Sequence, residues 1–132
     1  MRTKAIKTRS KAKPKPKSKL SKLQEVIVDA VLDKKGEEVI SLDLRKIGDA
    51  VTDYFIICHA SSKVQVKAIA DHVAEKVKAE LKENPWHSEG FENYEWVLID
   101  YVNVVAHIFL KERREFYQLE ELWQDAERTE HE

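Results

Sequence analysis

The segment from Tyr54 to Ala60 constrains the fold more than any other part of this 132-residue chain, because nearly all of its residues (YFIICHA) are apolar. A strand with one face in water alternates apolar and polar side chains, whereas a strand that is covered on both faces does not. The segment therefore predicts a central strand with a layer of structure against each face.

The residues before and after this strand have the spacing of amphipathic helices. The apolar residues that would share one face of a first helix, with Gly36 as its stop, are Leu20, Leu23, Ile27, Ala30 and Val31. A longer helix is predicted over 62–83, because Ser61 and Ser62 are suitable N-caps and Asn84-Pro85 would end it. A short strand over 39–44 is expected between the first helix and the central strand.

The C-terminal half predicts a β-hairpin followed by a helix. After a loop at 85–93, strands over 95–101 and 103–110 would meet at a turn around Val102-Asn103, and a last helix would begin near Arg113. The order αββαββα predicts an α/β (α+β) fold in which helices pack on a mixed sheet of about four strands. The length suits one domain, which we place at 20–126, and the acidic end at 127–132 is expected to fray.

The N-terminal segment, 1–19, has a different composition from the rest. Ten of the 23 Lys and Arg residues lie within the first 22 positions, and all 24 Asp and Glu residues follow them. A segment with so little apolar surface is expected to be disordered, and its lysines would be attracted to nucleic-acid phosphates. Alternatively, the arm aids solubility or folds back on the acidic body.

The turn at Val102-Asn103 sets which side chains of the hairpin share a face. Antiparallel register then places Trp96 opposite Phe109, Leu98 opposite His107, and Asp100 opposite Val105, all on one face. The other face is aliphatic and suits contact with helices; it collects Val97, Ile99, Tyr101, Val104, Ala106, Ile108 and Leu110. The first face, with its large aromatic rings and few polar groups, is typical of a partner-binding patch. In the alternative interpretation, the first helix or the N-terminal region covers it and leaves a core histidine and a buried tryptophan.

Catalytic and cofactor motifs are missing from the sequence. Three glycines occur, and none has the spacing of a phosphate-binding loop. Cys58 and His59 are neighbours on a strand, so their side chains point to opposite faces and cannot form a dyad. The five histidines have no zinc-ligand spacing, and Asp43, Asp53 and Asp100 include no Asp-x-Asp pair for two metal ions. We therefore expect no enzyme activity, metal or cofactor.

Two features of the sequence indicate where the protein acts. A single cysteine cannot form an intrachain disulfide, and no apolar run is long enough to span a membrane. A cytoplasmic protein is expected.

The residues that carry a family resemblance lie in order along positions 20–126. They are Asp53-Tyr54-Phe55-Ile56-Ile57-Cys58, Ser62, Gln65, Ala68-Ile69-Ala70-Asp71-His72, Glu89-Gly90, Trp96-Val97-Leu98-Ile99-Asp100-Tyr101, Val104-Val105-Ala106-His107-Ile108-Phe109, Arg113, Tyr117, Leu119-Glu120 and Leu122-Trp123. In these residues the chain resembles the ribosomal silencing factor family (RsfS, also called Iojap). It departs from the family in two places: Val102-Asn103 stands where the family usually has Gly-Asp, and His59-Ala60 stands where it has Thr-Gly.

The resemblance implies a fold related to nucleotidyltransferases but without their catalytic acids, and a translation repressor that is not an enzyme. Family members bind large-subunit ribosomal protein fourteen and sterically block joining of the small subunit. The expected contacts are Trp96, Leu98, Asp100, Asn103 and His107 on the sheet, with Tyr117 from the last helix. Lysines expected to contact rRNA are Lys11, Lys13, Lys15, Lys17 and Lys19.

One further expectation goes with this interpretation, and two alternative functions stay open. The free protein is expected to form a homodimer through its aromatic face. One alternative function is a divergent nucleotidyltransferase that uses Asp43 or Asp100 with magnesium. The other is a general RNA-binding module that depends on the arm.

Overall fold

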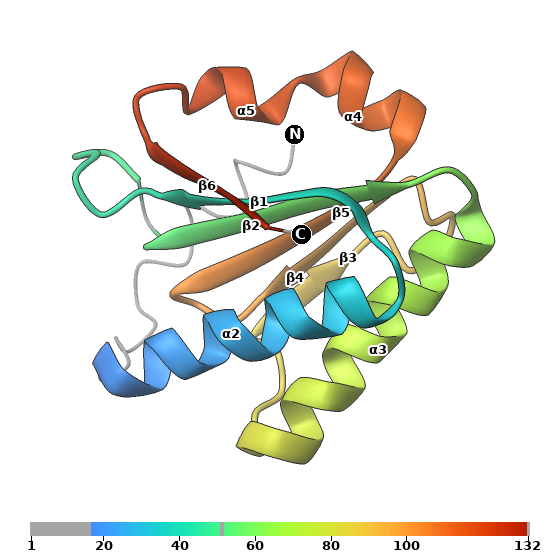
Figure 1. Cartoon of the computed structure of the whole chain (residues 1–132), viewed down its shortest axis with the longest axis horizontal. Helices are drawn as coiled ribbons and strands as arrows, with labels where there is room; N and C mark the ends of the chain where they lie inside the picture. Colours follow the sequence, from blue (N-terminus) through green and yellow to red (C-terminus); the bar gives the residue numbers. More distant parts are fainter. Residues whose placement is uncertain (1–16, 51, 132) are drawn as a thin grey trace.

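The computed structural model describes residues 17–50 and 52–131 (Figure 1). Its helices and strands are α2 (Lys17–Asp33), β1 (Glu37–Asp43), β2 (Tyr54–Ala60), α3 (Lys63–Leu81), β3 (His87–Glu89), β4 (Trp96–Asp100), β5 (Val104–Leu110), α4 (Lys111–Tyr117), α5 (Leu119–Leu122) and β6 (Glu127–His131). The fold is of the mixed α and β class that the sequence predicts.

The strands form one sheet in the order β3-β4-β5-β2-β1-β6. Among the described strands, β2 and β5 form the one parallel pair, and the other neighbouring pairs are antiparallel. The central position of β2 is confirmed, and its residues from Phe55 to Ala60 are buried. The parallel pairing connects the N-terminal half of the fold directly to the predicted hairpin.

Within the described residues the sheet has six strands rather than the predicted four, and the two additional strands are its edges, β3 and β6. β3 lies within the expected loop, and β6 occupies the expected frayed end, so the prediction of fraying is wrong for Glu127–His131. Both edge strands consist of polar residues, so they lack the apolar alternation that predicts a strand. Backbone pairing with β4 and β1, respectively, defines them instead.

Helices lie on both faces of the sheet, as Figure 1 shows. α2 and α3 pack against the aliphatic face in a core that includes Ile27 and Ile69 with Val97 and Ile108. α4 and α5 lie over the opposite face, where Leu119 joins a second core with Phe55. No helix in the described part of the chain is long and apolar enough to cross a membrane.

Two helix boundaries differ from the predictions. α2 begins at Lys17 rather than Leu20, so the boundary of the expected disordered arm is wrong for 17–19; residues 1–16 lie outside the described part. The predicted last helix is two short helices, because Gln118 adopts a left-handed conformation (φ 47°) that ends α4. The N-cap of α3 is Ser62, as predicted, and its hydroxyl accepts a hydrogen bond from the Gln65 amide.

Candidate functional site

A cluster of aromatic rings lies where β4 and β5 pass under α4. The hairpin register is the predicted one, so Trp96 lies opposite Phe109, and their rings stack at a centroid distance of 4.8 Å. Tyr117 at the end of α4 contacts the same indole at 4.9 Å. The Trp96 Nε1–H donates a hydrogen bond of 3.1 Å to Nδ1 of His107. The cluster thus joins the hairpin to the C-terminal helices.

His107 is a buried, neutral member of this cluster. Its ring is fully inaccessible, and burial lowers its pKa to about 3. Because Nδ1 accepts the indole hydrogen bond, the ring proton of the neutral histidine resides on Nε2. The side chain therefore fixes the orientation of Trp96 and does not carry charge near neutral pH.

Most of the predicted contact residues are less accessible than expected. The exposed fraction is 8% for Trp96, 0% for Leu98 and His107, and 1% for Asp100, so the prediction of an open face is wrong for these four residues. The alternative with a core histidine and a buried tryptophan is confirmed. The predicted cover by the first helix is wrong, because α2 packs on the opposite face and α4 and α5 supply part of the cover. The N-terminal region, which was the other predicted cover, lies outside the described residues.

Tyr117 and the hairpin turn are the accessible members of the predicted set. Tyr117 has an exposed fraction of 36%, and Val102 and Asn103 are partly exposed. Asp100 accepts a hydrogen bond from the Val102 amide at 2.8 Å, and the Thr52 hydroxyl donates to the Val102 carbonyl at 3.0 Å. These bonds hold Val102 at a φ of +81°, a left-handed conformation that is rare for a β-branched residue. Hydrogen bonds from both sides therefore hold the conformation of the hairpin turn.

Arg114, which is not among the predicted contact residues, anchors α4 to the sheet. Its guanidinium donates to the Glu38 carbonyl (2.8 Å), to Nδ1 of His59 (3.0 Å) and to the Glu120 carboxylate (2.8 and 3.0 Å). The side chain is only 6% exposed, and burial, followed by the nearby guanidinium, lowers the pKa of His59. Arg114 lies three residues before Tyr117, and this helical spacing is the one signal that could have placed it on the inner side of α4.

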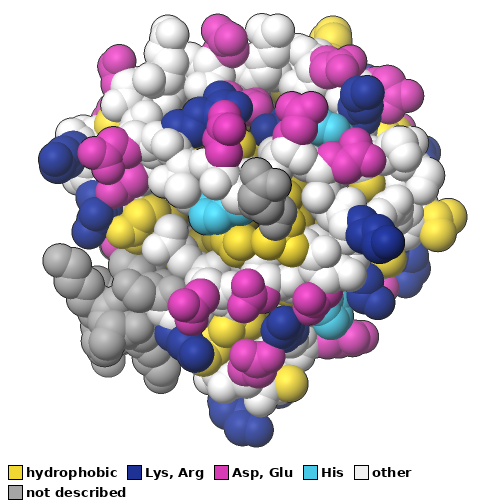
Figure 2. All heavy atoms as spheres, in the orientation of Figure 1, with side chains coloured by type: hydrophobic (Ala, Val, Ile, Leu, Met, Phe, Trp, Pro, Cys, Tyr) yellow, Lys and Arg dark blue, Asp and Glu magenta, His cyan; other side chains and the backbone are white. Residues whose placement is uncertain are grey.

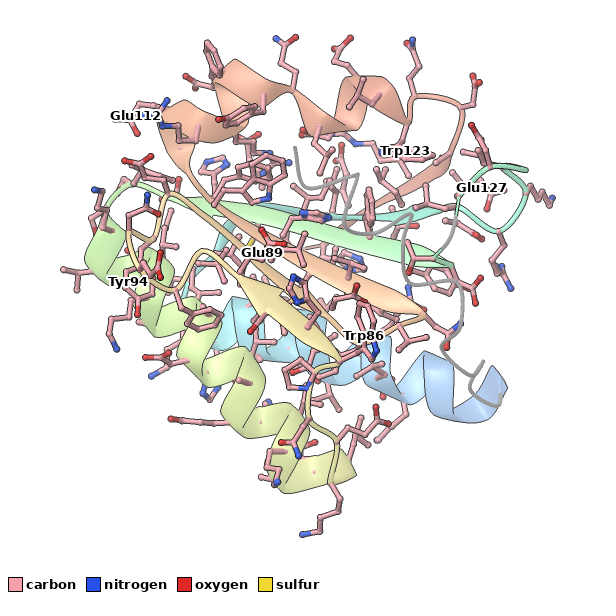
Figure 3. The ribbon with its side chains drawn as sticks, turned by 180° about the vertical axis from the view of Figure 1, so that it is seen from behind. Trp86, Glu89, Tyr94, Glu112, Trp123 and Glu127 are labelled. Atoms are coloured by element: carbon pink, nitrogen blue, oxygen red, sulfur yellow. The ribbon has the colours of Figure 1, made fainter. Side chains whose placement is uncertain are left out.

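The edge strand β3 extends the hairpin face. Its register places His87 opposite Asp100 and Glu89 opposite Leu98, so both side chains lie on the face of the aromatic cluster. His87 Nε2 and the Glu89 carboxylate are 2.7 Å apart. Figure 3, viewed from the β3 side, shows Glu89 on this edge and Trp123 between α5 and the sheet. A partner on this face would therefore meet a polar border with an acidic group.

The acids considered for metal chemistry have structural partners. Arg45 forms a two-point hydrogen-bonded ion pair with Asp43 and lowers the pKa of that carboxyl. Asp53 accepts from the Asn103 side-chain amide at 3.1 Å, and Asp100 caps the turn. No group of three or more His, Cys, Asp or Glu side chains in the described ranges could hold a metal ion.

Cys58 is a buried core residue. Burial raises the pKa of its thiol to about 12, so the thiolate is strongly disfavoured near neutral pH. Cys58 packs in the core under α2 and α3, whereas His59 contacts Arg114 of α4, so their side chains lie on opposite faces as predicted.

Comparisons with known proteins agree over most of the chain. Residues 16–132 match the family described as "Ribosomal silencing factor during starvation". The chain is 45% identical over 104 residues to the ribosomal silencing factor RsfS of Halalkalibacterium halodurans, covering 79% of this chain and 87% of that protein. It is 43% identical over 97 residues to RsfS of Bacillus subtilis, covering 71% of this chain and 78% of that protein. A crystal structure of a Chromobacterium violaceum protein superposes with a TM-score of 0.74 at 36% identity, covering 79% of this chain and 85% of that one.

Proposed function

The chain belongs to the ribosomal silencing factor family, and from this premise we propose that it represses translation by binding the large ribosomal subunit and blocking its joining with the small subunit. The observation that carries the proposal is the family match over nearly the whole described fold. The mechanism needs no catalysis, because a folded protein bound at the subunit interface sterically excludes the small subunit.

The proposed partner is protein fourteen of the large subunit, and the proposed contact surface is centred on Tyr117 and the Val102-Asn103 turn. Tyr117 offers an aromatic side chain of the kind that dominates binding energy at protein interfaces. The buried residues Trp96, Leu98, Asp100 and His107 act beneath this surface: the indole supports the Tyr117 ring, and the Asp100 carboxylate holds the turn.

Charge supports a basic partner for this acidic body. All 24 acidic residues of the chain follow position 22, and opposite charges on two partners accelerate their association. Lys11, Lys13 and Lys15 lie outside the described residues, whereas Lys17 and Lys19 belong to the first turn of α2. We include contact of these lysines with rRNA in the proposal, and we place its action in the cytoplasm.

Co-sedimentation with separated ribosomal subunits tests the proposed function. The protein is expected to migrate with large subunits and not with small ones, and its excess is expected to reduce the formation of joined ribosomes. Failure to migrate with large subunits, or normal joining in its excess, would contradict the proposal. Calorimetric titration with nucleotide and Mg²⁺ tests the enzymatic alternative, which predicts measurable heat of binding.

Substitution of Tyr117 and Trp96 tests the proposed surface. Tyr117→Ala is expected to weaken binding to protein fourteen by about 2 kcal/mol, which is the range of interface hot spots. Trp96→Ala, compared as a folded variant, is also expected to weaken binding, because the Tyr117 ring then loses its support. Tyr117→Phe, which keeps the ring, should retain most of the affinity. Val64→Ala serves as a control, because Val64 is 80% exposed on α3, over the opposite face of the sheet. Unchanged affinity of folded Tyr117→Ala protein would remove this surface from the proposal.

A further inference from the structure

His59 is a buried histidine near the C-terminal end of β2, on the face of the sheet that α4 covers. Its exposed fraction is 4%, and its Nδ1 lies 3.0 Å from a nitrogen of the Arg114 guanidinium. The guanidinium has only N–H donors, so Nδ1 accepts this hydrogen bond and the ring proton of the neutral histidine resides on Nε2. His59 therefore holds Arg114 only while the imidazole is neutral.

Protonation of His59 removes the acceptor at Nδ1 and places a positive charge against the guanidinium. Arg114 is only 6% exposed, so water screens this repulsion poorly. On the other side of the ring, Nε2 lies 3.3 Å from the carboxylate of Glu37, which is half exposed and attracts an imidazolium only weakly. Burial and then the Arg114 guanidinium lower the pKa of His59 by more than Glu38 and Glu37 raise it, so the ring is neutral near pH 7.

A cavity of about 250 Å³ beside His59 gives the ring a route to protons from the solvent. Figure 2 shows acidic and basic side chains intermixed in this part of the surface, over α4 and α5 at the top of the view. The charged residues that line the cavity are Glu38 of β1, Lys111, Arg114 and Glu115 of α4, Glu120 and Glu121 of α5, and Arg128 of β6. Among the lining residues, His59 is the one whose ordinary pKa lies between pH 5 and 8.

α4 connects Arg114 to the proposed docking surface. Arg114 and Tyr117 lie about one helical turn apart on this helix of seven residues, which is too short to be stable without its contacts to the sheet. The bonds from Arg114 to the Glu38 carbonyl and to Glu120 do not involve the imidazole. Protonation of His59 is therefore expected to displace α4 and Tyr117 without unfolding the protein.

We propose that His59 is a positioning residue for the docking surface and makes it sensitive to pH: the neutral ring holds Arg114 and with it Tyr117, and the protonated ring displaces them. The inference rests on the proposed function, because Tyr117 belongs to the surface proposed to contact protein fourteen. Affinity for the large subunit is therefore complete near neutral pH and decreases as His59 becomes protonated.

Binding to purified large subunits at about pH 7.5 and about pH 5 tests this proposal with the full-length chain. The affinity of the wild-type chain is expected to fall by about fivefold or more relative to that of His59→Asn, whose amide oxygen accepts from Arg114 at both pH values. His59→Phe lacks an acceptor and is expected to bind weakly at both. His72→Asn removes a histidine that pairs with Asp33 on the α2 and α3 side, so it is expected to keep the wild-type change. A wild-type change in His59→Asn would overturn the proposal.

NMR titration of the free chain tests the coupling without ribosomes. The signals of the Arg114 Nε–H and of the Tyr117 ring are expected to shift with the same midpoint as His59, and to lose this shift in His59→Asn. Titration of His59 with no response from Arg114 and Tyr117 would overturn the proposal. Because no ribosome is present, this experiment fails only if the coupling is absent, whereas a lack of large-subunit binding at both pH values contradicts the proposed function.

Discussion

Val102, at the tip of the β4–β5 hairpin, combines a β-branched side chain with a φ of +81°. Its amide donates to Asp100 and its carbonyl accepts from Thr52, so two hydrogen bonds maintain a conformation that valine disfavours. Strained backbone of this kind concentrates at functional sites, and here it coincides with the turn proposed to contact the ribosomal partner.

Replacing this valine is expected to stabilise the protein. Val102→Gly removes a left-handed penalty of roughly 1–2 kcal/mol and adds roughly 0.5–1 kcal/mol of backbone entropy cost, so the free energy of unfolding should rise by about 0.5–1 kcal/mol. Urea denaturation measures this difference. Val64→Gly, on the exposed side of α3, should instead lower stability. A loss of stability for Val102→Gly would show that its side chain contributes more than the strain costs.

His107 makes stability depend on pH. Its pKa is about 3 in the folded state and about 6.5 in an unfolded chain, so the unfolded state binds more protons between these values. The contribution of neutral His107 to the free energy of unfolding is therefore complete above about pH 6.5, and it decreases as the pH falls toward 3. Between pH 7 and 4.5, the wild-type protein should lose about 2–3 kcal/mol more than His107→Gln, whose amide oxygen can still accept from Trp96. Denaturant titrations at the two pH values compare these losses, and equal losses would contradict the buried neutral state.

At the scale of elements, Arg114 decides how the C-terminal helices lie on the sheet. α4 and α5 are short, and a left-handed Gln118 separates them, so neither is stable alone. The Arg114 guanidinium joins both helices to the start of β1 and to β2 through Glu120, the Glu38 carbonyl and His59. The position of Tyr117 depends on these contacts, because Tyr117 lies between Arg114 and Glu120 in the sequence.

Arg114→Lys is expected to lower stability by about 2 kcal/mol, because a single ammonium group cannot replace the planar set of donors at a buried site. Arg113→Lys is the matched control on the same helix: Arg113 is 44% exposed and pairs with Glu95, so its replacement should change stability by less than about 0.5 kcal/mol. Thermal unfolding of both variants makes the comparison. Equal effects would show that Arg114 does not fasten α4.

At the scale of the whole molecule, the chain separates its charges between an N-terminal arm and an acidic body. The first 16 residues carry seven Lys or Arg side chains and no acid. These residues lie outside the described part of the chain, whereas the proposed docking surface lies within it.

Deleting residues 1–16 is expected to leave the fold intact and to reduce the salt dependence of large-subunit affinity, because fewer phosphate counterions are released on binding. A matched variant keeps the length and replaces the seven basic residues with Gln, which separates charge from tether length. Equal slopes of log affinity against log salt, with and without the arm, would exclude phosphate contact. Complete loss of association would favour the alternative of an RNA-binding module that depends on the arm.

The sequence by itself determined the elements that have a periodic apolar pattern. The central strand, the Ser62-capped helix and the hairpin register all follow from local spacing, and so does the separation of Cys58 from His59. Strand and helix periodicity specify which side chains share a face, so the aliphatic face and its helix cover were also predictable. The family resemblance rests on these same segments.

Tertiary structure alone decided that both faces of the hairpin are covered, and where the sheet ends. Burial of Trp96 and His107 depends on α4 and α5, whose position is set by the long-range bonds of Arg114 and not by local spacing. β3 and β6 exist because backbone groups of β4 and β1 pair with them, and backbone pairing requires no particular side-chain pattern. Exposure and edge pairing are properties of neighbours distant in sequence, which is why local periodicity does not encode them.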